Sequence, residues 1–540
     1  MSVRDHPATQ RPPFLSPAVA PRTPRADDSA SPSTGLQVLL FVLAAALSGF
    51  TILREISPHD EGLMLQAGSR IAAGQWPYRD FWTNYMPGQP LVLALLQQIF
   101  GPSLLAWRIV RTLTDATVAL LAYRLARRRA PESYALAAWL AVAGAMAFPT
   151  GPGPNPPALA LAFGALLAAR GRPSLGGVLA GIACLFRLEI GVAAIIGVAL
   201  EAPIGARARA AAIGTSCGVI VLAPFFLAGP GAMWHDTLGF YSIQGLQRLP
   251  FPLGFHGPLR PSKLIEFYIP LILVIGLALW GLAAALRMGP RPPVYARAAL
   301  GGGITATMHR PARIDPASLS LVPLALVGLA YLIGRTDVFH LIPLAAVLPI
   351  MLAQAAAAAR IAAVRIALLC ALGLIVLHGL DRRAGQLLHP PSLAAVPGPA
   401  GDGVKTDTAD ARALGSLERS IARLTRPGEP IFVANPRHDR VTAGDPLLYV
   451  ILGHPNPTRY DVMQPGLVTT ASVQRQIVDS LRRSHTRVVI RWLDPRAEAI
   501  EPNGSARSSG VHILDRYLAA TYRPYARFGV YQVLVLRAAQ

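Results

Sequence analysis

Runs of about 17–25 apolar residues recur along the chain, and they constrain its fold more than any other feature. The first run is LQVLLFVLAAALSGFTIL, residues 36–53. A helix of this length crosses the hydrocarbon core of a bilayer, which is about 30 Å thick. Because no A-x-A cleavage site follows closely, we interpret this run as an uncleaved membrane anchor and not as a secretory signal.

Further runs of this kind predict an α-helical polytopic membrane protein with about 11 transmembrane helices. The candidate spans after the first cover approximately residues 103–124, 133–149, 156–169, 174–186, 190–203, 211–228, 266–286, 317–334, 341–358 and 361–379. The composition agrees with this interpretation, since 52% of the residues are hydrophobic and only 15% are charged. The apolar run at 90–101 is too short to cross a bilayer and predicts an interfacial helix.

The formal net charge of +21 is carried largely by short arginine clusters between the apolar runs. Such clusters mark cytoplasmic loops under the positive-inside rule, so we expect no nucleic acid as a partner. A cytoplasmic N-terminus places the clusters at 123–129, 169–172 and 206–209 inside and the C-terminus outside. The strong preference for Arg over Lys is typical of GC-rich bacterial genomes, so the predicted location is a bacterial inner membrane.

The composition predicts four parts along the chain. They are a disordered cytoplasmic tail at 1–35, a transmembrane domain at 36–380, a linker rich in Pro and Gly at 381–408, and a small soluble α/β domain outside the membrane at 409–540. In this last part the residue patterns predict helices at 409–424 and 470–483, strands at 430–434 and 486–493, and two edge-like strands near 524–537.

The loop after the first span, residues 54–102, begins with SPHDEGLML at 57–65. One interpretation of its two adjacent acids is structural. Ser57 as the N-cap and Asp60 three residues later form a capping-box pattern, which predicts a helix from 58 to 73 that ends at Gly74. The alternative interpretation is that Asp60 and Glu61 carry out chemistry.

Other charged residues near this loop favour the chemical interpretation. Arg79, Asp80 and Tyr85 follow within the loop, among several aromatic residues. Arg108 and Arg111 lie near the outer end of the next span, where the positive-inside rule disfavours arginine, and they share a helix face. Outward arginines opposite a carboxylate pair suggest an anionic ligand held beside a general base.

A second pair of charges, Arg187 and Glu189, falls between two apolar half-spans. Charges at membrane depth are costly, so this pair is either a structural ion pair at a helix break or a contact to an anionic substrate. His59, His235 and His256 could in principle join acids around a divalent ion. Because no two of these histidines have close ligand spacing, we expect neither a metal nor another cofactor.

The order of motifs resembles the C-type (GT-C) membrane glycosyltransferases, in the family 39-related branch near protein O-mannosyltransferases, aminoarabinose transferases and lipopolysaccharide sugar transferases. The resemblance is carried by the first span, DEG, a short helix, GQWPYRDF, MPG, an apolar helix and the arginine that heads span two. The segment GRTDVFHLIP at 334–343 is similar to an outward turn between late spans of that family.

The resemblance implies a glycosyltransferase that moves a sugar from a polyprenyl-phosphate donor to a hydroxyl of a cell-envelope lipid, glycan or protein. It makes Asp60 the general base, Glu61 a supporting acid and Asp80 a carboxylate near the acceptor. Arg335, Asp337 and His340 would then point into the same cavity as Asp60, where Arg108, Arg187 and Arg335 would hold the lipid phosphate.

Two other classes of function remain open from the sequence. A transporter or lipid-linked sugar flippase would also have many spans, a broken segment and charges at membrane depth. A non-catalytic membrane scaffold could use the C-terminal domain to bind a partner.

Overall fold

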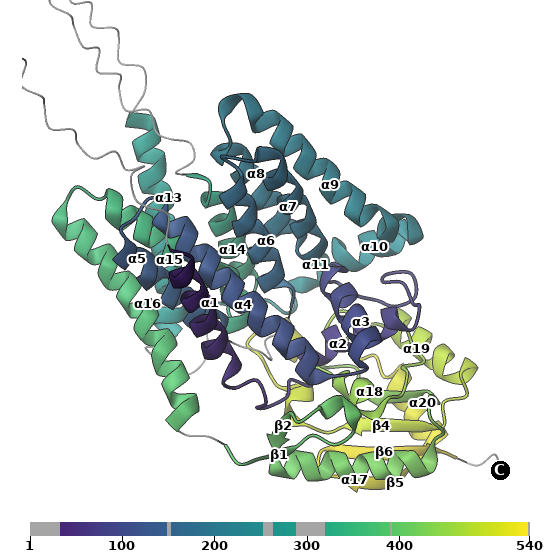
Figure 1. Cartoon of the computed structure of the whole chain (residues 1–540). Helices are drawn as coiled ribbons and strands as arrows, with labels where there is room; N and C mark the ends of the chain where they lie inside the picture. The colour runs from purple at the N-terminus through teal and green to yellow at the C-terminus, as the bar shows by residue number, and fades with distance from the viewer. Residues whose placement is uncertain (1–32, 148–152, 252–262, 288–318, 389–390, 538–540) are drawn as a thin grey trace, which may run out of the picture.

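The computed structural model describes residues 33–147, 153–251, 263–287, 319–388 and 391–537. Most of the predicted N-terminal tail, His256 and the loop at 288–318 therefore lie outside the described residues. The described residues form a helical part and a smaller C-terminal domain that contains a β-sheet (Figure 1). The sheet domain lies at one end of the helical part, against the short helices α2 and α3 (Figure 1).

The helical part consists of helices α1 to α16. Their bounds are α1 Thr34–Gly49, α2 Asp60–Ala72, α3 Gly88–Phe100, α4 Leu104–Arg127, α5 Glu132–Met146, α6 Asn155–Ala168, α7 Pro173–Phe186, α8 Leu188–Glu201, α9 Arg207–Ala228, α10 Pro230–Thr237, α11 Phe240–Gln244, α13 Ile269–Arg287, α14 Val322–Gly334, α15 Val338–Ala358 and α16 Ala362–Leu388. Each predicted span coincides with one of these helices.

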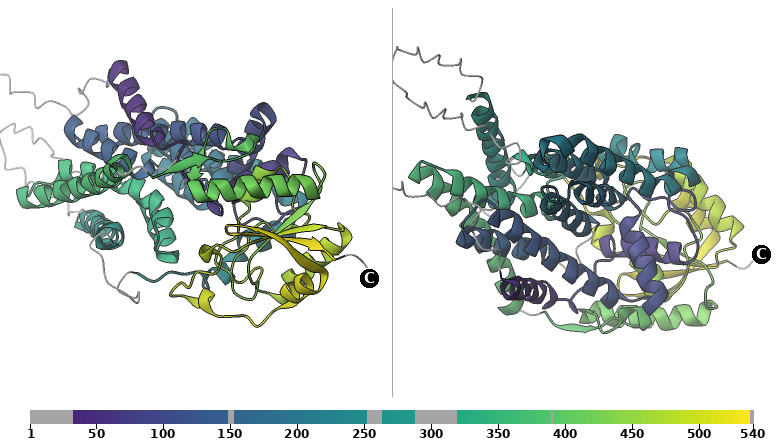
Figure 2. Two further views of the ribbon diagram at one scale, coloured as in Figure 1. Left: turned by 90° about the horizontal axis from the view of Figure 1, so that it is seen from below. Right: turned by 45° about the horizontal axis from the view of Figure 1, so that its top comes forward.

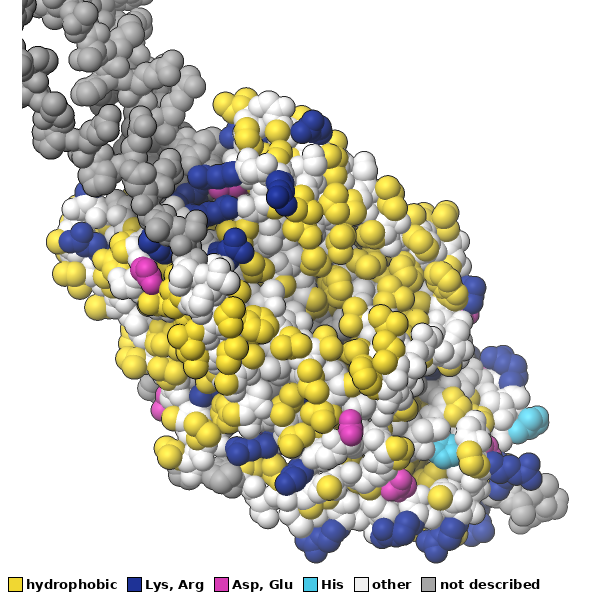
Figure 3. All heavy atoms as spheres, in the orientation of Figure 1, with side chains coloured by type: hydrophobic (Ala, Val, Ile, Leu, Met, Phe, Trp, Pro, Cys, Tyr) yellow, Lys and Arg dark blue, Asp and Glu magenta, His cyan; other side chains and the backbone are white. Residues whose placement is uncertain are grey.

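Three helical stretches are long and apolar enough to cross a membrane by length and composition: Ile204–Ala228, Val338–Ala358 and Ala362–Leu388. Several further apolar helices are shorter, with 10–17 residues, so the predicted number of 11 spans stays a prediction. Hydrophobic side chains cover much of the visible face of the helical part, whereas Lys and Arg side chains gather over the C-terminal domain and at the opposite end of the helical part (Figure 3). This division is the one expected for a protein with a lipid-facing part and a water-facing part.

The helices pack closely because small residues line their contacts. On α7, Gly177 and Gly181 face α9 so tightly that an added Cβ would lie 2.5 Å from the carbonyl oxygen of Ala210 and 2.6 Å from that of Gly214. Alanines dominate the buried core shared by α4, α5, α6 and α15. Close helix contacts through small residues are typical of membrane bundles.

The C-terminal domain holds a four-stranded sheet in the order β3-β4-β6-β5. Its elements are β1 Leu393–Ala395, β2 Lys405–Asp407, α17 Thr408–Leu424, β3 Ile431–Ala434, α18 Leu447–Leu452, α19 Ala471–Arg483, β4 Val488–Trp492, α20 Ile513–Thr521, β5 Tyr522–Phe528 and β6 Tyr531–Leu536. Strands β3 and β4 are parallel, and β6 is antiparallel to both β4 and β5. Figure 2 shows the sheet from below, with α17 along one of its sides.

Two sequence-based details of this domain were wrong. The last two strands are not both edge strands, because β6 lies inside the sheet between β4 and β5. The segment 381–408 is not a plain linker either, since α16 continues to Leu388 and the hairpin β1–β2 follows.

The helices α2 and α3 belong to the hydrophobic core of the C-terminal domain. Leu63, Trp82 and Leu93 are buried in one cluster with Phe432 and Ile477. The backbone N–H of Trp82 donates to the carbonyl of Arg459 at 2.8 Å. Helix α2 also packs so closely on α18 that a Cβ at Gly62 would lie 2.4 Å from the backbone nitrogen of Leu447. The first loop is thereby fixed to a domain that begins more than 300 residues later.

Candidate active site

A cavity of about 1100 Å³ opens between the helical part and the C-terminal domain. Its walls come from the turn before α2, from α8 and α14, from the turn between α14 and α15, and from loops of the C-terminal domain. Of the predicted site residues, it brings together Asp60, Tyr85, Arg187, Glu189, Arg335, Asp337 and His340. The cavity is therefore assembled from segments far apart in the sequence.

Asp60 is the first residue of α2 and lines this cavity. Within the described part of the chain, its carboxylate makes no hydrogen bond and no ion pair. Its charge instead acts electrostatically on His59 and on Tyr85, which line the same cavity. A carboxylate with free lone pairs at a cavity wall is available to accept a proton from a bound ligand.

His59 is held by the C-terminal domain. Its Nδ1 accepts a hydrogen bond of 3.2 Å from the backbone N–H of Gly444. Burial lowers the pKa of His59, and the nearby Arg335 lowers it further, although Asp60 and the bond from Gly444 act against this. A neutral ring that accepts at Nδ1 carries its proton on Nε2, so His59 is a hydrogen-bond donor beside Asp60.

The predicted cap of α2 was wrong. Ser57 does not cap the helix; His59 occupies the N-cap position, without a side-chain hydrogen bond. The backbone N–H of Ser57 instead donates to Glu61 Oε2 at 3.2 Å. The predicted end of the helix was right, because Gly74 adopts a positive φ of 86° directly after the C-cap.

Glu61 points away from the cavity and forms a buried ion pair with Arg108. Arg108 Nε donates to Oε1 at 2.8 Å and Nη2 donates to Oε2 at 2.9 Å, and neither side chain is exposed. Arg108 also donates to the carbonyls of Ile52 and Glu55. Arg108 is thus occupied in fixing the chain between α1 and α2 to α4.

Three more predicted residues lie outside the cavity lining. Arg111 pairs with Asp115 one turn further along α4, at 2.8 Å and fully buried. Arg79 and Asp80 pair with each other at 2.7 Å on an exposed turn. This bond to Arg79 lowers the pKa of the Asp80 carboxyl. Each charge therefore has a protein partner near it in sequence.

Arg187 is a cation of the cavity wall whose hydrogen bonds are incomplete among the described residues. It is paired with Glu189, and its guanidinium lies 4.4 Å from the centre of the Tyr331 ring. Its Nε is buried and has no hydrogen-bond partner among the described residues. A buried unsatisfied donor costs about 1–3 kcal/mol, which an anionic ligand could recover.

Arg335, by contrast, is saturated. Its Nε donates to Asp337 Oδ2 at 2.8 Å, and Nη1 donates to Glu501 Oε2 at 2.9 Å and to the Gln247 carbonyl at 2.7 Å. Burial alone would raise the pKa of Asp337, but bonds from His340 and the charge of Arg335 outweigh it and lower the pKa. Arg335 therefore ties the turn between α14 and α15 to the C-terminal domain.

One end of the cavity is an apolar groove between α8 and α14. On α8, Leu188, Val192, Ile196 and Leu200 repeat every four residues along the groove. Leu326 and Val327 of α14 lie opposite. The distance from Glu189 to Leu200 corresponds to about 17 Å of helix, at 1.5 Å per residue. Val192, Ile196 and Leu326 are about half exposed, so the groove has an open side.

The other end of the cavity contains residues that the sequence did not single out. Thr442, Gln464, Trp492, Arg496 and Glu501 all come from the C-terminal domain. The predicted strands at 430–434 and 486–493 could have indicated these residues. Ligands of open α/β sheets bind beyond the carboxyl ends of the strands, so the loops after both strands are candidate ligand contacts. Thr442 follows β3, and Arg496 and Glu501 follow β4.

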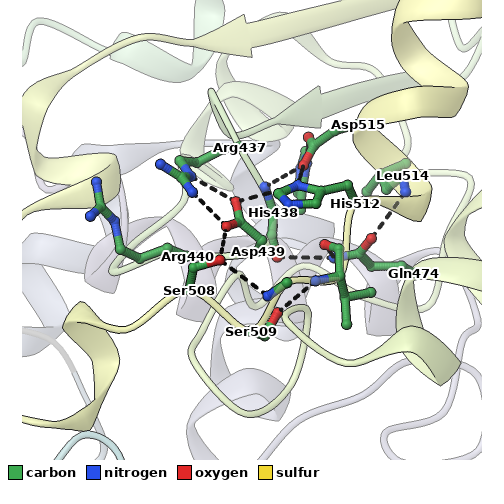
Figure 4. Close-up of polar contacts among 12 residues, drawn as sticks. Arg437, His438, Asp439, Arg440, Gln474, Ser508, Ser509, His512, Leu514 and Asp515 are labelled. Carbon is green, nitrogen blue, oxygen red and sulfur yellow. Dashed lines mark hydrogen bonds and ion pairs between the residues drawn. The ribbon is translucent and has the colours of Figure 1, made fainter.

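One group of side chains in the described residues has the proximity that a metal ion needs. Asp439, His512 and Asp515 offer ligand atoms within 4.8 Å of one another (Figure 4). Arg437 Nε already donates to Asp439 at 2.7 Å, and His438 Nδ1 contacts Asp515 at 2.7 Å. Because both carboxylates have partners, we assign no metal to this group.

No family model matches the sequence, and no curated protein matches it. Solved structures do match. ArnT from Cupriavidus metallidurans bound to undecaprenyl phosphate aligns with a TM-score of 0.51 and 16% identity over 94% of this chain and 99% of that chain. The apo state of ArnT aligns with a TM-score of 0.52 and 16% identity over 94% of this chain and 100% of that chain. The arabinofuranosyltransferase AftD from Mycobacteria aligns with a TM-score of 0.46 and 15% identity over 95% of this chain and 40% of that chain.

At this level of identity the likeness concerns the arrangement of helices and the attached domain along nearly the whole chain. The chain therefore has the fold of ArnT.

Proposed function

We propose that this protein transfers a sugar from a polyprenyl-phosphate donor to an acceptor hydroxyl, with inversion at the anomeric carbon and with Asp60 as the general base. The observation that carries the proposal is the place of Asp60. Its unpaired carboxylate lines a cavity with an apolar groove at one end and a polar end formed by the C-terminal domain. A lipid-linked donor and a polar acceptor need such a two-ended site.

In the proposed step, the acceptor oxygen attacks the anomeric carbon while its proton passes to the Asp60 carboxylate. The bond from the anomeric carbon to the phosphate oxygen breaks, and the lipid phosphate keeps the electron pair. This leaving group is already charged and needs little protonation, so one base and a cationic contact are sufficient. Attack from the side opposite the phosphate inverts the configuration.

Arg187 is the residue that we assign to the donor phosphate. Its Nε is buried and unpartnered among the described residues, and it lies at the head of the groove on α8. Arg335 takes the supporting role, because its donors are already bound to Asp337, Glu501 and Gln247. The polyprenyl chain would lie in the apolar groove, with its open side toward lipid.

The groove also weighs against the alternative of a flippase. A charged headgroup that crosses the bilayer needs polar side chains along its path. The part of the groove that α8 and α14 form beyond Glu189 is lined by aliphatic side chains. This lining suits a prenyl chain that stays in place while the chemistry occurs at one end.

The test is release of polyprenyl phosphate from polyprenyl-phosphate sugars by the purified full-length protein in lipid nanodiscs. We expect Asp60→Asn to lower the rate about 10²–10⁴-fold, the usual contribution of a general base. We expect Arg187→Gln to raise the donor KM and to lower kcat as well, because the phosphate charge increases in the transition state.

Asp479→Asn is the matched control, since Asp479 lies on the exposed side of α19 outside the cavity lining. If Asp60→Asn releases polyprenyl phosphate at the wild-type rate, the assignment of the base is wrong. If the wild-type protein releases none from any donor but moves lipid across the bilayer, the transferase proposal is wrong.

A further inference from the structure

We call the polar end of the cavity the domain-side compartment. It is lined by Gln247, Thr442, Gln464, Trp492, Arg496 and Glu501. In the C-terminal domain, Thr442, Gln464 and Glu501 lie in loops, Arg496 lies in the 3-10 helix Pro495–Glu498, and Trp492 ends β4. The loops after the parallel strands β3 and β4 both contribute, which is where open α/β sheets commonly bind ligands.

Hydrogen-bonding groups in this compartment have unused capacity. Gln464 Oε1 accepts only a long bond of 3.4 Å from Gln247 Nε2, and its own amide N–H groups have no partner among the described residues. Trp492 is 2% exposed, yet its indole Nε1 is buried without a hydrogen-bond partner in the described part of the chain. Most buried polar atoms are paired, so this indole N–H is a donor that a ligand hydroxyl could satisfy if the side chain turned toward the cavity.

The charges in the compartment are already balanced within the protein. Arg496 Nε and Nη2 donate to the carboxylate of Asp494 at 2.9 and 2.7 Å. Glu501 is paired with Arg335 through Nη1 at 2.9 Å. Because each of these charges already has a counterion, a charged ligand would find no uncompensated opposite charge there. The compartment therefore suits a neutral polar group.

The compartment is also within reach of Asp60. The segment that carries Thr442 continues to Gly444, whose N–H bonds to His59, the neighbour of Asp60. Leu447 N–H donates to the carbonyl of Pro58 at 3.3 Å, which fixes the same segment to the turn before α2. A ligand in the compartment thus shares the cavity with Asp60 and lies against a segment that is bonded to the turn before α2.

We propose that the domain-side compartment binds the acceptor and that the acceptor is a neutral, polyhydroxylated glycan. This inference rests on the transferase function proposed above. A hydroxyl both donates and accepts, so it matches the amide of Gln464, and it can accept from the indole N–H of Trp492. One further hydroxyl gives its proton to Asp60 and forms the new bond to the anomeric carbon.

The experiment uses the full-length protein in nanodiscs with polyprenyl-phosphate sugars and three kinds of acceptor. These are water, a panel of neutral methyl glycosides, and peptides that contain Ser and Thr. We expect slow release of polyprenyl phosphate with water, and faster release plus a disaccharide product with at least one methyl glycoside. Transfer to the peptides alone, or release with water that no methyl glycoside accelerates, overturns the inference.

Two variants test the residues. Gln464→Ala should raise the KM for the methyl glycoside about two- to tenfold, the effect of one lost neutral hydrogen bond, and this loss should exceed any change in the rate of release with water. Gln476→Ala is the matched control, because Gln476 lies exposed on α19 and bonds to Tyr460.

An unchanged KM in Gln464→Ala overturns the assignment of this residue to the acceptor, whereas an equal loss with water indicates a structural role and overturns it too. Absence of release with every acceptor, water included, overturns the proposed function itself and this inference with it.

Discussion

The buried pair of Arg108 and Glu61 allows a structural role and a substrate-binding role to be separated by experiment. Arg108→Met keeps most of the side-chain volume but removes the charge and all the hydrogen-bond donors. It leaves the Glu61 carboxylate, which is fully buried, without its counterion. It also leaves the carbonyls of Ile52 and Glu55 without their donor.

Breaking a buried ion pair by removing one partner costs about 3–5 kcal/mol, mainly because the remaining charge is uncompensated. The backbone at Glu55 adds to this expectation, because its φ of 61° is unfavourable for a side-chain-bearing residue and Arg108 holds its carbonyl. The double variant Arg108→Met/Glu61→Gln has no orphaned charge, so we expect it to be more stable than Arg108→Met by about 1–3 kcal/mol.

The free energy of unfolding of the wild type, both single variants and the double variant, measured by denaturant titration in one detergent, gives the coupling energy. Release of polyprenyl phosphate is measured on the same samples below their unfolding midpoints. If Arg108→Met is as stable as the wild type but binds the donor poorly, the structural role of Arg108 is refuted. Arg108 would then be a residue that binds the donor phosphate.

Two more predictions concern the attachment and the protonation of the C-terminal domain. Gly62→Ala places a Cβ 2.4 Å from the backbone nitrogen of Leu447. We therefore expect the free energy of unfolding to fall by about 1–3 kcal/mol and the C-terminal domain to be proteolysed faster. Equal proteolysis of variant and wild type would contradict the tight contact. Burial raises the pKa of Asp445 to about 7. Between about pH 4 and 7 the native state therefore holds a proton that the unfolded chain has released. Because of this difference, the free energy of unfolding falls by up to about 1.4 kcal/mol per pH unit as the pH rises. Asp445→Asn removes this term, so its unfolding temperature should exceed that of the wild type at pH 8 and not at pH 4; parallel pH profiles would contradict the assignment.

The sequence by itself determined the long apolar helices, the helices of the C-terminal domain at 409–424 and 470–483, and most of the strands. A long apolar run forms a helix in a bilayer because every backbone polar group must be satisfied within the segment, and run length is a local property. The helix end at Gly74 and the helix at 409–424 were likewise predicted from neighbouring residues only. The structure has both of them. The motifs around DEG also predicted the fold of a membrane glycosyltransferase, and the chain has the fold of ArnT.

Only the tertiary structure placed the side chains of Asp60 and Glu61 in different surroundings. Adjacent residues on a helix point about 100° apart, so one carboxylate meets the cavity and the other meets Arg108. Which direction faces the cavity depends on where α4 and α18 pack, and the sequence around position 60 holds no information on that. The sequence could not predict Gln464, Trp492 and Glu501 as site residues either. They lie about 400 positions after Asp60, and only long-range packing brings them into the same cavity.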